Sequence, residues 1–194
     1  MDRRRFFTGI ASAALFGGCV GGSSGTGVPR TVSVKQIERE PREYGVTLQA
    51  TVTEADVTTS QTASVEVRFT NTSEESTPDI GIDTRYPDPL WSIDENYTRA
   101  PGSILVPETY SPQPERASNT CWEPTENFEF AGPGIAESTT LDPGEQLTRT
   151  YSVWGDTATE GCMPPGEYRF GVRNNRPDPP MEWTFTLLIE DEPF

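Results

Sequence analysis

The stretch from Val46 to Phe69 decides the fold. It reads VTLQATVTEADVTTSQTASVEVRF. Apolar side chains alternate with polar ones in its first part (Val46, Leu48, Ala50, Val52) and again in its last part (Ala63, Val65, Val67, Phe69). A period of two predicts antiparallel strands with one face on a core and the other in solvent. The polar link at 54–62 predicts that the two strands form a hairpin.

Later segments repeat the alternation. Further strands are expected at Leu147–Trp154, Tyr168–Val172 and Trp183–Ile189, with a short first strand from Val32 and one more at Phe128–Phe130. No segment carries a convincing amphipathic helix. Seven or more short strands within residues 30–194 predict one all-β domain, an antiparallel β-sandwich.

Two turns near the C-terminus narrow this expectation. They are Leu141-Asp142-Pro143-Gly144-Glu145 and the segment Pro164-Pro165-Gly166-Glu167-Tyr168-Arg169-Phe170. Together they resemble the C-terminal half of immunoglobulin-like domains related to bacterial intracellular proteinase inhibitors, over residues 44–73 and 138–190. The resemblance implies an immunoglobulin-like sandwich in which the Tyr168 hydroxyl ties a corner to the backbone. It also implies an inhibitor-like module as one possible function, although such turns support fold more than function.

Composition excludes several functions. The 194 residues hold 15 basic and 30 acidic side chains, no His and one Lys, Lys35, for a net charge of −15. Without His there is no Ser-His-Asp triad, Cys-His pair or His-ligated metal. The acidic balance repels nucleic acid. We therefore expect no catalytic residues, no cofactor, no metal site and no nucleic-acid partner. A hydrolase that uses paired carboxylates stays an alternative, but no pair is selected by the sequence.

The first 19 residues read MDRRRFFTGIASAALFGGC. Arg3-Arg4-Arg5-Phe6-Phe7 resembles a twin-arginine export motif, and Phe16-Gly17-Gly18-Cys19 resembles a lipobox. The resemblance implies a signal peptide at 1–18, lipidation of Cys19 and a flexible Gly/Ser tether over 19–29. Alternatives are an ordinary cleavable signal with Cys19 incidental, or an uncleaved amphipathic end.

The cation choice, 14 Arg against one Lys on an acidic chain, is similar to that of proteins from halophilic archaea. The whole pattern resembles a secreted lipoprotein of a halophilic archaeon, which implies attachment to the outer face of the membrane through the lipid on Cys19. The plainer alternative is an acidic protein from elsewhere.

Two cysteines remain once Cys19 is assigned to lipid. An exported protein can keep a disulfide, and Cys121 and Cys162 allow one pairing. Closing that loop would stabilise the fold by roughly 4 kcal/mol in the chain-entropy model. A catalytic thiol or a metal site is the alternative, but there is no His and no CxxC pair to support it.

The segment 74–127 is expected to be a long insertion. It holds 8 of the 18 prolines, and proline disfavours central strands. Short extended pieces are expected at 80–82, 90–93 and 104–106. An aromatic-rich loop on a rigid sandwich is a common binding site for a protein or a glycan. The candidate contacts are Tyr86, Trp91, Tyr97, Tyr110 and Trp122. Alternatively, the segment covers the sheets, with its aromatic rings buried beneath it.

Two N-glycosylation sequons, beginning at Asn71 and Asn96, are candidate modification sites for an exported protein. Taken together, the sequence predicts a lipoprotein anchored on the cell surface that acts by binding and not by catalysis. A protease-inhibitor-like module and a structural envelope component without a specific ligand are the alternatives.

Overall fold

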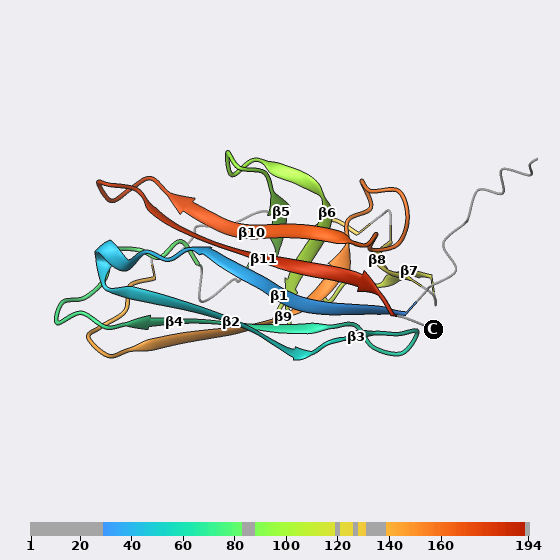
Figure 1. Cartoon of the computed structure of the whole chain (residues 1–194), viewed down its shortest axis with the longest axis horizontal. Coiled ribbons are helices and arrows are strands. Elements are labelled where there is room, and N and C mark those ends of the chain that lie inside the picture. Colours follow the sequence, from blue (N-terminus) through green and yellow to red (C-terminus); the bar gives the residue numbers. More distant parts are fainter. Residues whose placement is uncertain (1–28, 83–87, 119–120, 126–127, 131–138, 193–194) are drawn as a thin grey trace, which may run out of the picture.

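The computed structural model describes residues 29–82, 88–118, 121–125, 128–130 and 139–192 (Figure 1). These residues form eleven strands and one 3-10 helix, η1 (Arg42–Tyr44). The strands are β1 (Arg30–Arg39), β2 (Val46–Glu54), β3 (Asp56–Val57), β4 (Ser64–Asn71), β5 (Leu90–Ile93), β6 (Arg99–Pro107), β7 (Arg116–Ser118), β8 (Cys121–Pro124), β9 (Gln146–Gly155), β10 (Gly166–Asn174) and β11 (Met181–Asp191).

Two antiparallel sheets pack against each other. The first, sheet A, has the order β10-β11-β1-β3, and the second, sheet B, has the order β2-β4-β9-β6-β5. Strand β10 contacts β5 along one side of the molecule, and β1 contacts β2 along the other. A separate two-stranded ribbon joins β7 and β8. The described chain is therefore an all-β sandwich, as the sequence predicted.

The hairpin predicted around Val46–Phe69 is present. Val46 pairs with Asn71 and Val52 with Val65, and the inward side chains of both strands lie in the core. The link between the two strands also contains a short strand of its own. Asp56 and Val57 form β3, which pairs with the start of β1 in sheet A. Burial of Val57 in the core gives the reason for this crossing from one sheet to the other.

The middle segment contributes strands to sheet B. β5 and β6 lie at its edge, and β6 sits between β5 and β9. Pro101 precedes the run of β6 that pairs with β9, and Pro107 ends it, so neither interrupts the ladder. The expected pieces at 90–93 and 104–106 are thus real strands.

Two other expected segments are not strands: the short extended piece at 80–82 and the strand at Phe128–Phe130, of which the second was a wrong prediction. Residues 80–82 are irregular, although Ile80 and Ile82 are buried in the core. Phe128–Phe130 form no strand, and the rings of Phe128 and Phe130 pack into a cluster of aromatic side chains. In both places the apolar residues at alternate positions pack against other apolar side chains, but their backbone does not pair with a neighbouring strand.

A tyrosine fastens the corner before β10. The Tyr168 hydroxyl donates to the carbonyl of Pro164 at 2.6 Å, which is the bond expected from the turn sequence. The ring of Tyr168 lies against the backbone of β6, where a Cβ atom on Gly102 would overlap it. Only glycine therefore lets sheet B approach this ring closely.

Candidate functional site

The five candidate aromatic residues do not form one site. Trp91, Tyr110 and Trp122 share a cluster with Trp154, Phe128 and Phe130, which we call the aromatic cluster. Tyr97 lies apart, in the turn between β5 and β6. Tyr86 lies outside the described residues.

The aromatic cluster lies on the outer face of sheet B. In β6, Leu105 points into the main core, whereas Ile104 and Val106 on either side of it support the cluster. Alternate residues of a strand point to opposite faces, so the cluster rests on the face away from sheet A. Chain from the predicted insertion thus covers this part of the sheet.

An arginine already lies over a ring face of each of two half-buried tryptophans, Trp91 and Trp122. The Arg99 guanidinium lies 3.3 Å from the ring centroid of Trp91, and that of Arg116 lies 4.2 Å from the ring centroid of Trp122. Trp122 also meets Trp154 edge to face and donates its indole N–H to a backbone carbonyl. Stacking of a sugar on either ring would first have to displace an arginine. These contacts favour the covering interpretation for both residues.

A disulfide joins Cys121 in β8 to Cys162 in the loop after β9, with 5.4 Å between the Cα atoms. It fastens the cover to the sandwich, as the sequence predicted. Glu123 lies close enough to complete a set of three possible metal ligands with the two sulfurs, but both sulfurs are bonded to each other. Burial, together with the negative charge of Asp156, raises the pKa of Glu123.

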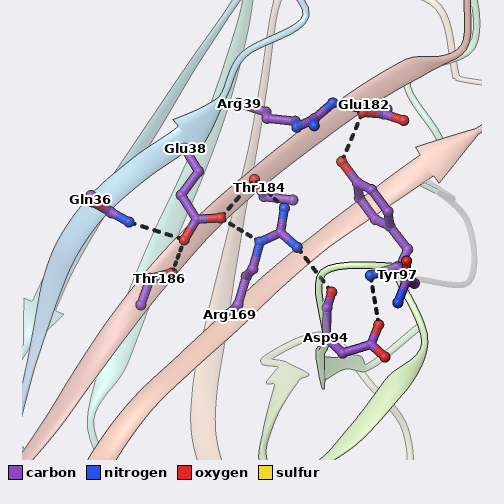
Figure 2. Close-up of polar contacts among 10 residues, drawn as sticks. Gln36, Glu38, Arg39, Asp94, Tyr97, Arg169, Glu182, Thr184 and Thr186 are labelled. Atoms are coloured by element: carbon purple, nitrogen blue, oxygen red, sulfur yellow. Dashed lines mark hydrogen bonds and ion pairs between the residues drawn. The ribbon is translucent and has the colours of Figure 1, made fainter.

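An ordered polar network lies on the outer face of sheet A (Figure 2). Glu38 accepts hydrogen bonds from Thr186 at 2.5 Å and from Gln36 at 3.2 Å, and it pairs with Arg169. Burial raises the pKa of Glu38, but these hydrogen bonds and the arginine outweigh it, so the pKa lies below its usual value. Arg169 also donates to the backbone carbonyl of Asp94 at 2.9 Å, which ties sheet A to the β5–β6 turn.

Tyr97 is attached to the same network. Its hydroxyl donates to Glu182 at 3.2 Å, and the Arg169 guanidinium lies 5.3 Å from its ring centroid. Glu182 also pairs with Arg39 and with Arg173. Burial and the charge of Glu182 raise the pKa of Tyr97, although the two arginines nearby act in the opposite direction.

A shallow groove of about 670 Å³ opens beside this network. It lies between the end of β1, helix η1 and the turn from β10 to β11, and we call it the distal groove. Its lining residues are Ile37, Glu38, Arg39, Glu40, Arg42, Glu43, Pro179, Pro180 and Glu182. The Tyr44 hydroxyl donates to the carbonyl of Pro179 and joins two of its walls.

Ile37 contributes an apolar side chain to the lining of the distal groove. It pairs with Phe185, a core residue, yet it is 36% exposed and is the one exposed large hydrophobic side chain among the described residues. Register shifts in β1 flank it on both sides. The strand leaves the regular ladder on both sides of Ile37, which accords with the exposure of a side chain that pairs opposite a core residue.

The distal groove lies far from the place where the described chain begins. Arg30 pairs with Asp191 at one end of sheet A, and β1 runs from there toward the groove. Figure 1 shows η1 and the β10–β11 turn at the end of the molecule opposite the arrowhead of β11. Ten residues of strand span roughly 30 Å. Sequence reasoning missed this site, because the charged run 38–43 and the prolines at 177–180 are brought together only by the pairing of β1 with β11.

The two sequons have opposite environments. Asn71 is 1% exposed, and its side-chain nitrogen donates to the carbonyls of Glu75 and Leu141. Asn96 is exposed at the β5–β6 turn. These two bonds use both hydrogens of the side-chain nitrogen, so a glycan on Asn71 would remove at least one of them.

No family model matches the chain, and no curated protein and no solved structure shows significant similarity to it. Among the described residues, no helix is long and apolar enough to cross a membrane.

Proposed function

We propose that the protein is a lipoprotein held outside the cell by a lipid on Cys19, and that it acts by binding a partner and not by catalysis. The distal groove is the proposed binding surface. The sandwich itself is proposed to be immunoglobulin-like, which the Tyr168–Pro164 bond and its turn sequence support.

The observation that carries the proposal is the position of the groove. A tether that precedes Arg30 enters the domain at one end of β1, and the groove lies at the other end. A domain attached to a membrane through that flexible tether would carry the groove at the end farther from its attachment point. This is the end that a partner outside the cell reaches without steric hindrance from the bilayer.

The lining indicates the chemistry of the partner. Four Glu and two Arg line the groove, so its formal charge is −4 + 2 = −2. Ile37, Pro179 and Pro180 add apolar side chains to the lining. A protein segment with one apolar side chain between basic ones matches both features.

The ion pairs of the carboxylates that line the groove favour binding over hydrolysis. Glu38 and Glu182 are held by arginines, and Glu40 pairs with Arg42. A carboxylate fixed in an ion pair is a poor proton donor at neutral pH. The two cysteines of the sandwich are joined and offer no nucleophile.

The test is a cross-linked pull-down from intact cells in native salt, with three variants. Ile37→Glu replaces the exposed apolar side chain of the groove lining with a charged one, and Glu43→Lys reverses the charge of an exposed lining residue. Thr59→Glu is the matched control, because Thr59 is exposed in the loop after β3, at the end near the tether. We expect Ile37→Glu and Glu43→Lys to lose the partner and Thr59→Glu to retain it.

The outcomes separate the alternatives. A captured protease whose activity falls on titration with the purified domain would favour the inhibitor-like module. Equal recovery of background proteins by all three variants and the wild type would favour a structural envelope component and contradict the binding proposal.

A further inference from the structure

We propose that Asn96, at the tip of the β5–β6 hairpin, is the residue of this protein that carries an N-linked glycan, and that Asn71 carries none. In the cell this modification rests on the proposed extracellular location, because glycans of this kind are added to exported chains. The choice between the two acceptors rests on the fold alone.

Backbone hydrogen bonds shape the tip without using the Asn96 side chain. The Asp94 carboxylate accepts the backbone N–H groups of Asn96 and Thr98, each at 2.8 Å. The N–H of Asp94 donates to the Thr98 carbonyl at 2.9 Å, which closes the turn. Among the hydrogen bonds of the described residues, none involves the side-chain amide of Asn96 or the hydroxyl of Thr98, and both residues are exposed.

The middle residue of the sequon anchors the tip. Tyr97 has a φ of 61° and directs its hydroxyl to Glu182 on β11, as Figure 2 shows. Its ring lies beside the Arg169 guanidinium. This side chain is turned toward sheet A, while Asn96 and Thr98 on either side of it are exposed. The two residues that a glycan transferase must recognise are thus accessible in the folded protein.

Asn71 has the same sequon chemistry in the opposite environment. Its side-chain nitrogen, the atom that would be glycosylated, donates to Glu75 at 2.7 Å and to Leu141 at 2.9 Å. Its side-chain oxygen accepts from the backbone and the hydroxyl of Ser73. Ser73 is the third residue of that sequon, so its hydroxyl is engaged as well. Both recognition groups are therefore used inside the folded domain.

The transfer uses a lipid-phosphate-linked oligosaccharide as donor. A bond forms between Asn96 Nδ2 and C1 of the first sugar, and the bond between C1 and the phosphate oxygen breaks. The lipid phosphate leaves with the bonding electrons, and Nδ2 loses one proton to a base of the transferase. No oxidation or reduction occurs, so an exposed amide and a donor are the only substrates required.

The acceptor choice is tested on the purified full chain, independently of export. The folded protein is incubated with membranes that contain the transferase and the lipid-linked donor, and glycopeptides are mapped by mass spectrometry. We expect a mass increase on the Asn96 peptide and none on the Asn71 peptide. Asn96→Gln and Thr98→Ala should lose the increase, whereas Thr98→Ser, which keeps the sequon, should retain it.

The unfolded chain provides the control. After reduction and unfolding, the Asn71 peptide should also become an acceptor, because its hydrogen bonds are gone. Modification of Asn71 in the folded protein, or of Asn96 only after unfolding, would overturn the inference. Mapping of protein recovered from the cell exterior then separates the two proposals: an unmodified Asn96 there contradicts the glycan, whereas protein confined to the cell interior contradicts the proposed location.

Discussion

Loss of the Cys121–Cys162 disulfide is expected to lower the free energy of unfolding by about 4 kcal/mol. The two residues are 41 positions apart, so the bridge closes a loop of about 42 residues. The chain-entropy model assigns such a loop about 13 cal/mol/K, which is about 4 kcal/mol at 25 °C. For a domain of this size each kcal/mol shifts Tm by about 2–4 °C, so Tm should fall by roughly 8–16 °C.

The structure adds a local expectation to this global one. Among the described strands, β8 pairs only with the three-residue strand β7, and it also contacts β9. Without the bridge, the cover should loosen before the sandwich unfolds, and Trp122 in β8 should report it. We expect a red shift of tryptophan emission that precedes the loss of β-structure measured by circular dichroism.

The assay compares the oxidised protein, the same protein with reductant, and the double variant Cys121→Ser/Cys162→Ser. Mass spectrometry after alkylation establishes the state of the thiols in each sample. Reductant should change Tm of the wild type and leave the double variant unaffected. An unchanged Tm in samples with both thiols free would refute the reasoning, and so would a fall in Tm without any early change in tryptophan emission.

Three further predictions follow from single residues. Cys19→Ser should release the protein into the medium, as judged by fractionation; retention in the membrane fraction contradicts the lipid anchor. Glu38→Gln should destabilise the fold at pH 7 by roughly 1 kcal/mol or less, because solvent screens a side chain this exposed. The folded-state pKa of Glu38 is lowered, so its contribution to stability is present above the unfolded value of 4.5 and is lost as the pH falls through the folded value. The difference in unfolding free energy between the wild type and Glu38→Gln should therefore be smaller at pH 3 than at pH 7 in denaturant melts. A difference that does not change with pH argues against this contribution. Tyr168→Phe should lower stability by about 1 kcal/mol through loss of the bond to Pro164, and an unaltered denaturation midpoint would show that this bond adds nothing.

The sequence was enough to predict the alternating strands, the disulfide and the Tyr168 bond. Alternation in Val46–Phe69 depends only on which face of a strand is buried, and the structure confirms it. The disulfide was predictable because two cysteines allow one pairing. The Tyr168 bond spans four positions, so its turn sequence was enough to indicate it.

The remaining features depend on contacts between distant residues. β3 pairs with two residues of β1 that lie 25 and 27 positions earlier in the chain, and β6 pairs with β9, which begins about 40 positions later. Composition also cannot tell whether an aromatic ring is free or covered, as Arg99 on Trp91 illustrates. The distal groove combines residues more than 130 positions apart, and no single segment carries a signal for it.

Photocross-linking in intact cells is the most direct test of the distal groove as a binding surface. A photoreactive amino acid replaces Ile37 in one variant and Thr59 in another. The amount of each variant on the cell surface is first matched to that of the wild type. We expect position 37 to give a discrete cross-linked protein that Glu43→Lys abolishes, and position 59 to give none. The same products from both positions, or none from position 37, would contradict the proposed function.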